Sequence, residues 1–79
     1  MEIEPGCVVR SRAGHDKGRV YAVIAVENGF ASVVDGELRK TAKPKRKNVR
    51  HLAYLGKLDT ADAKNAEDHV LRKLLSSWR

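Results

Sequence analysis

The chain has 79 residues, of which 42% are hydrophobic and 33% are charged, and its formal net charge is +6. This length allows one domain and is too short for two separate cores. No apolar stretch approaches the roughly 20 residues of a membrane-spanning helix, and the N-terminal MEIEPG lacks the apolar segment of a secretory signal. The single cysteine, Cys7, cannot form an internal disulfide. We therefore expect a cytoplasmic protein in a reducing compartment, without membrane association.

Five short β-strands are predicted before residue 57, because runs of β-branched and apolar residues are separated by turn sequences. The predicted strands cover residues 6–11, 20–26, 30–34, 38–41 and 49–55. Asn28-Gly29 and Asp35-Gly36 supply the turns around the third strand. The second strand, VYAVIAV, is apolar on both alternating faces, which a central position in a small barrel would explain. The pattern favours a mainly β, SH3-like antiparallel barrel, since closure removes exposed sheet edges.

After Gly56 the pattern changes to that of one amphipathic C-terminal α-helix. Asn65, followed three residues later by Asp68, is similar to a capping box, and a start as early as Asp62 also fits. The apolar residues that recur at helical spacing are Val70, Leu71, Leu74, Leu75 and Trp78. We expect this stripe to close an open end of the barrel; the alternative is a surface for a partner protein. The barrel (1–57) and the linker with its helix (58–79) would form one domain.

Positive charge is concentrated in one segment of the chain. Residues 1–38 contain four basic and six acidic residues, and residues 59–79 contain four of each sign. Residues 39–57 contain eight basic residues and no acidic residue. An unopposed basic block is typical of a surface that binds a polyanion, most often nucleic acid. The alternative is a solvated surface without a dedicated partner.

The segment RKTAKPKRKNVR (39–50) has the chemistry of an RNA clamp. Pro44 favours an extended backbone, so the cations project along a stiff strip that can follow a phosphate chain. Lysine attracts phosphate as a point charge, arginine can bind phosphate in bidentate fashion, and asparagine or histidine can add hydrogen bonds. The candidate RNA contacts of this strip are Lys43, Lys45, Arg46, Lys47, Asn48, Arg50 and His51.

A second candidate segment, RAGHDKGR (12–19), lies between the first two predicted strands, where glycines shape a turn and Lys17 points outward. This part of the chain resembles the KOW motif of ribosomal proteins and of transcription factors that act with RNA polymerase. The resemblance lies in a hydrophobic strand, the sequence GHDKG, and two further strands of which the last ends in Asp35-Gly36. Together, VVRSRAGHDKGR, VVDGELRK and KPKRKNVRHL resemble the KOW-type large-subunit ribosomal proteins of archaea and eukaryotes, which have small relatives in bacteria. The resemblance covers about residues 6–52 and implies an SH3-like fold with ribosomal or other structured RNA as partner. Arg12, Lys17 and Arg19 of this loop are the remaining candidate contacts.

Aromatic residues are few, and Tyr54 is the candidate for base stacking. Phe30 and Trp78 are expected to pack in the core or between the helix and the barrel. Cys7 and the three histidines lack the paired spacing of zinc sites, and GHDKG lacks the spacing of a P-loop. We therefore expect neither catalysis nor a metal or other cofactor.

The predicted function is that of an RNA-binding protein of the translation machinery. The expected partner is ribosomal RNA, with ribosomal proteins as further partners, and the chain is expected to be ribosome-associated and monomeric when free. The alternative is a KOW-type adaptor in transcription or translation, which would bind a partner protein through the apolar stripe of its helix.

Overall fold

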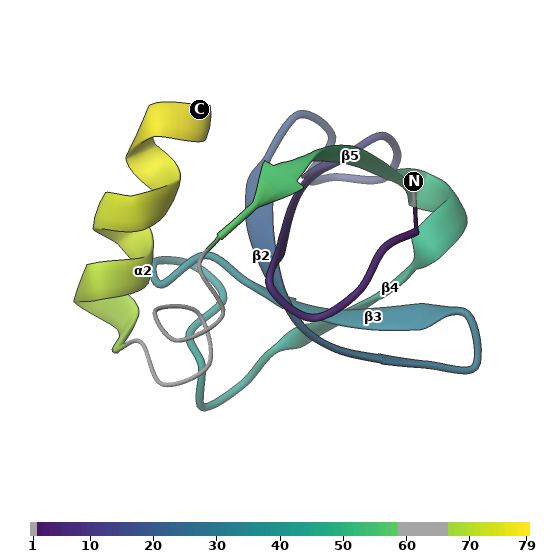
Figure 1. Cartoon of the computed structure of the whole chain (residues 1–79), viewed down its shortest axis with the longest axis horizontal. Helices are drawn as coiled ribbons and strands as arrows, with labels where there is room; N and C mark the ends of the chain where they lie inside the picture. The colour runs from purple at the N-terminus through teal and green to yellow at the C-terminus, as the bar shows by residue number, and fades with distance from the viewer. Residues whose placement is uncertain (1, 59–66) are drawn as a thin grey trace.

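The computed structural model describes residues 2–58 and 67–79 (Figure 1). Five antiparallel strands form one curved sheet in the order β4-β3-β2-β1-β5. The strands are β1 (Cys7–Ser11), β2 (Val20–Glu27), β3 (Phe30–Val34), β4 (Lys45–Asn48) and β5 (Leu52–Lys57). A 3-10 helix, η1 (Val49–His51), joins the two edge strands β4 and β5, and the chain ends with α2 (Asp68–Leu75) and η2 (Ser76–Trp78). Within the two described ranges, no helix has the length and apolar character needed to cross a bilayer.

The prediction of a mainly β protein with five strands and one C-terminal helix is confirmed. The first three strands lie where the sequence predicts them, to within one residue. The turn between β2 and β3 is also confirmed, because Asn28 (φ 52°) and Gly29 (φ 80°) both adopt the left-handed conformation of a tight hairpin. This hairpin sets the register of β2 and β3.

The predicted strand at 38–41 is wrong, because the Asp35 side chain folds this segment into a loop. Its Oδ1 accepts hydrogen bonds from the backbone N–H groups of Glu37 (2.9 Å) and Arg39 (2.8 Å). The fourth strand starts only at Lys45, after Pro44. The predicted strand at 49–55 also begins too early. The Asn48 side chain accepts the N–H of Arg50 (2.9 Å) and so caps the η1 turn that precedes β5.

Two hydrophobic clusters lie on opposite faces of the sheet. The inner cluster contains Cys7, Val9, Tyr21, Val23, Ala31, Val33 and Leu52. The outer cluster contains Val8, Val20, Ala22, Val34, Leu71 and Leu75. β2 contributes alternate residues to both clusters, so the helix that covers the outer face explains why β2 is apolar on both sides.

The apolar stripe of α2 packs in part on the outer face of the sheet and does not close an open end, and its residue Val70 is 37% exposed. Leu71 and Leu75 are fully buried there, and the Trp78 indole lies directly against Gly56 of β5. Burial of two leucine side chains contributes about 3–6 kcal/mol to the free energy of folding. The described helix begins at Asp68 after Glu67, and the starts predicted at Asn65 and Asp62 lie outside the described residues.

Candidate nucleic-acid interface

The side chains of β4 alternate between the two faces of the sheet. Directly opposed residues of antiparallel strands share a face. Lys45 and Lys47 are opposite Val33 and Ala31 of the inner cluster, whereas Arg46 is opposite Ser32 on the outer side. The basic strip that the sequence predicts is therefore divided by the pleat of the strand.

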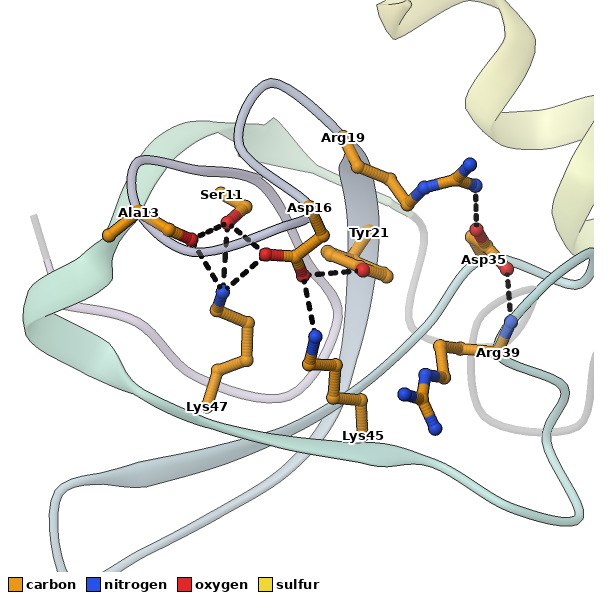
Figure 2. Close-up of polar contacts among 9 residues, drawn as sticks. All are labelled: Ser11, Ala13, Asp16, Arg19, Tyr21, Asp35, Arg39, Lys45 and Lys47. Carbon is orange, nitrogen blue, oxygen red and sulfur yellow. Dashed lines mark hydrogen bonds and ion pairs between the residues drawn. The ribbon is translucent and has the colours of Figure 1, made fainter.

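The carboxylate of Asp16, in the loop between β1 and β2, forms ion pairs with Lys45 and Lys47 (Figure 2). Its Oδ1 lies 2.8 Å from the Lys47 Nζ, and its Oδ2 lies 3.2 Å from the Lys45 Nζ. The hydroxyl groups of Ser11 (2.9 Å) and Tyr21 (2.7 Å) donate to the same carboxylate. One acidic side chain thus joins β1, β2 and β4 through the loop of residues 12–19.

We call these five residues the Asp16 cluster: Asp16, Ser11, Tyr21, Lys45 and Lys47. Their contacts shift the pKa values of two groups in the cluster. Burial alone would raise the pKa of Asp16, but hydrogen bonds from Lys47, Tyr21, Ser11 and Lys45 outweigh it and hold that pKa far below its ordinary value. The pKa of Tyr21 is raised strongly, first by burial and then by the hydrogen bond to the Asp16 carboxylate. Asp16 is therefore ionised and the phenol of Tyr21 is neutral at neutral pH.

Lys47 lies inside the protein, which corrects its assignment to the RNA-contacting strip. Its side chain is only 7% exposed. The ammonium donates to the Ser11 Oγ (2.8 Å), the Ala13 carbonyl oxygen (3.1 Å) and the Asp16 Oδ1 (2.8 Å), so all three of its N–H bonds are used. Lys45 differs because its side chain is 29% exposed and can still offer a donor to solvent.

Arg19 is also held by an acidic partner, in a second ion pair. Its Nη1 donates to the Asp35 Oδ2 at 2.7 Å, and the Asp35 side chain is completely buried (Figure 2). Burial would raise the pKa of Asp35, but backbone N–H groups of Arg39 and Glu37, together with Arg19, lower it. The pKa of Arg19 is raised in turn by Asp35. Arg19 therefore supports the loop after β3, and a third of its side chain remains exposed.

The two segments singled out in the sequence lie side by side. The backbone N–H of Arg12 donates to the carbonyl oxygen of His51 (2.7 Å), which places the loop next to η1. Of the eight basic residues in 39–57, Lys45 and Lys47 pair with Asp16, and Lys57 pairs with Glu4. Five other cations of this block and two of the loop have no carboxylate of the described residues within 4.0 Å. They are Arg39, Lys40, Lys43, Arg46 and Arg50 of the block, and Arg12 and Lys17 of the loop.

The remaining predicted residues have mixed roles. The Asn48 carbonyl oxygen is used by the η1 cap, which leaves its amide N–H groups as donors. His51 is exposed on η1. Tyr54, the predicted stacking residue, is half-buried and packs against the inner cluster.

Phe30 is not a core residue, contrary to the prediction. It is 36% exposed, and the guanidinium carbon of Arg46 lies over its ring, 4.2 Å from the centroid. The alternation of β3 places Phe30 away from the inner cluster, because Ala31 and Val33 are the inward residues and Ser32 shares the other side with Phe30. Asp16 carries no comparable signal, since the two lysines that pair with it are some thirty residues away in the sequence.

No protein-family model matches the sequence, and no curated protein matches it. The resemblance to KOW-type ribosomal proteins therefore remains a prediction from the sequence blocks.

Proposed function

We propose that this protein is a non-catalytic RNA-binding protein with an SH3-like barrel of the KOW type, and that it binds ribosomal RNA as a ribosomal or ribosome-associated component. The strand order supports the barrel assignment, because β1 lies between β2 and β5 while β1 to β4 follow one another as neighbours. The observation that carries the proposal is the group of five cations in residues 39–50 that have no carboxylate partner among the described residues.

Attraction to the phosphate backbone supplies most of the affinity in this proposal. The Asp16 cluster holds the loop of Arg12 and Lys17 against the strand and turn that present Arg46 and Arg50. A surface ordered in advance loses less conformational entropy when it binds. Five phosphate contacts predict that the logarithm of the binding constant falls with the logarithm of salt concentration with a slope of roughly −3.5 to −4.5.

The alternative function, a protein adaptor that uses the helix stripe, gains no support from the fold. Leu71 and Leu75 are fully buried against the sheet, and Trp78 lies against Gly56. Val70 is 37% exposed and Leu74 is half-buried, so only this smaller part of the stripe is open to a partner while the helix stays docked. We therefore propose RNA binding alone.

A salt titration of binding to purified ribosomal RNA tests the proposal. The Lys43→Gln/Arg50→Gln variant should reduce the magnitude of the slope by about 1.4–1.8, because it removes two phosphate contacts. The matched control is Arg72→Gln/Lys73→Gln, which removes the same charge from exposed positions of α2 and should keep the slope of the unmodified protein.

Two results would overturn RNA binding as the function. The first is binding by the unmodified protein that does not weaken with salt, and the second is an equal loss in the two double variants. Competition with double-stranded DNA of equal length adds a further check, since DNA should displace RNA poorly if ribose hydroxyl groups are recognised. Co-sedimentation with ribosomal particles at increasing salt separates a permanent subunit, which is retained, from a peripheral factor, which is lost.

A further inference from the structure

The outer face of the sheet extends beyond the area that α2 covers. On β3 this face carries Phe30, Ser32 and Val34, because side chains alternate along the strand. Val34 is completely buried beneath the helix, whereas Phe30 is 36% exposed and Ser32 is half-buried. The hairpin end of the outer face is therefore open in the part of the chain that the structure describes.

This open end forms a small cleft of about 320 Å³. It is lined by residues of three adjacent strands: Ala25, Glu27, Phe30, Ser32 and Arg46. The register explains the grouping, because Glu27 is opposite Phe30 and Arg46 is opposite Ser32. The five residues thus form one continuous patch on the same side of the sheet.

The cleft combines a flat cationic surface with an acidic hydrogen-bond acceptor. The guanidinium carbon of the exposed Arg46 lies 4.2 Å from the centroid of the Phe30 ring, so the two groups form one stacked pair on which a nucleobase can add a further layer. Glu27 is exposed on the neighbouring strand, and no basic group of the described residues lies within 4.0 Å of its carboxylate. A carboxylate without a cation partner repels phosphate, but it accepts hydrogen bonds from N–H groups.

We propose that this cleft binds one unpaired guanine base of the RNA, with the base stacked on Arg46 and Phe30 and its Watson–Crick edge on Glu27. The proposal rests on the proposed RNA-binding function and adds a site that reads a base. Guanine presents two adjacent N–H donors on that edge, which match the two oxygens of a carboxylate. Adenine and cytosine place an acceptor nitrogen beside their amino group, and uracil places carbonyl oxygens on both sides of its N–H, so each would face Glu27 with a repelling lone pair.

Short single-stranded RNAs provide the first test. Fluorescence anisotropy compares an octauridine that contains one central guanosine with the same oligonucleotide that contains adenosine. Phe30→Leu should weaken binding of both roughly tenfold, because it removes the aromatic surface. Glu27→Gln should abolish the preference for guanosine and leave binding of the adenosine oligonucleotide at least as tight. Leu38→Ala, at a residue that is 69% exposed, is the control for loss of an exposed apolar side chain.

A titration with guanosine 5′-monophosphate separates this site from the basic strip. Backbone NMR signals of Phe30 and Ser32 should shift with the guanine nucleotide and not with adenosine 5′-monophosphate, and the shifts should be absent in Phe30→Leu. If Phe30→Leu and Glu27→Gln bind the guanosine oligonucleotide as the unmodified protein does, the base site is refuted while RNA binding through the strip stands. If the nucleotide binds at β3 but no RNA binds with a salt-dependent affinity, the base site stands and the proposed function fails.

Discussion

Replacing Asp16 with asparagine tests whether a single carboxylate holds the inner side of β4. The Asp16 side chain is 10% exposed and the Lys47 side chain is 7% exposed, so water stabilises neither charge well. Asparagine keeps the size of the side chain and one acceptor oxygen, but it removes the negative charge that faces two ammonium groups. The Lys47 ammonium would then be buried without a counter-charge.

The expected loss of stability in Asp16→Asn follows from that uncompensated charge. Removal of one partner of a buried ion pair costs about 3–5 kcal/mol, and the partial exposure of Lys45 places the expected loss near the lower limit, about 3 kcal/mol. A chain of 79 residues has a free energy of unfolding of roughly 4–12 kcal/mol, so Asp16→Asn should remove a quarter or more of it. The melting temperature should fall by about 12–24 °C.

Chemical denaturation measures this loss through Trp78 fluorescence and far-ultraviolet circular dichroism. Trp78 is the single tryptophan and lies against Gly56, so its emission reports the docking of the helix end on the sheet. Glu37→Gln is the control for loss of an acidic charge at the surface. Glu37 lies 3.7 Å from Arg79 in a pair with both side chains well exposed, and its loss should change the free energy of unfolding by less than about 1 kcal/mol.

A double variant distinguishes charge burial from simple loss of contacts. Lys47→Met removes the buried ammonium and leaves Asp16 paired with Lys45, so it should cost less than Asp16→Asn. Asp16→Asn/Lys47→Met should regain part of the stability lost in Asp16→Asn, because no unpaired charge remains inside. The reasoning is refuted if Asp16→Asn costs less than about 1 kcal/mol, or if the double variant is no more stable than Asp16→Asn.

Acid should destabilise the protein, because folding lowers the pKa values of Asp16 and Asp35. As the pH falls past about 4, the aspartates of the unfolded chain bind protons before those of the folded protein. The stability that Asp16 and Asp35 contribute is therefore complete above this pH and is lost progressively below it. Unfolding followed by circular dichroism between about pH 2 and 7 should show no increase in the free energy of unfolding on acidification. Gly36→Ala should loosen α2, since Gly36 has φ +76° and an added Cβ would collide with the Asp68 carbonyl oxygen; a thermal melt no lower than that of the unmodified protein would contradict this. Leu71→Ala should cost about 2–5 kcal/mol in chemical denaturation, because Leu71 is fully buried, and a loss below about 1 kcal/mol would contradict its place in the core.

The part of the fold that could be predicted is the part that local patterns determine. β2 and β3 are apolar runs around an Asn-Gly turn, so their limits and pairing follow from short-range sequence. β4 could not be located in this way, because KRKN contains no apolar residue and becomes a strand only by pairing with β3. The prediction of a strand at residues 38–41 is wrong for a similar reason, since the buried Asp35 side chain replaces strand pairing with hydrogen bonds to the loop.

The candidate site was predictable as a concentration of charge but not as a set of available side chains. Composition locates the basic block, because no acid occurs between residues 39 and 57. Which cations stay free depends on Asp16 and Asp35, whose partners are set by tertiary folding. Strand alternation places Phe30 on the same side as Ser32, but its exposure also requires that α2 covers only the Val34 end of this face.

The Asp16 cluster links the stability of the fold to the shape of the charged surface. A basic strand at a sheet edge discourages edge-to-edge association, but its alternate side chains necessarily turn inward. An inward lysine is tolerated only with a counter-charge and satisfied hydrogen bonds, which Asp16 and Ser11 supply to Lys47. The same contacts fix the loop of residues 12–19 beside η1, where Arg12 meets His51. The carboxylate that neutralises Lys45 and Lys47 therefore also positions Arg12 and Lys17, which belong to the proposed RNA-binding surface.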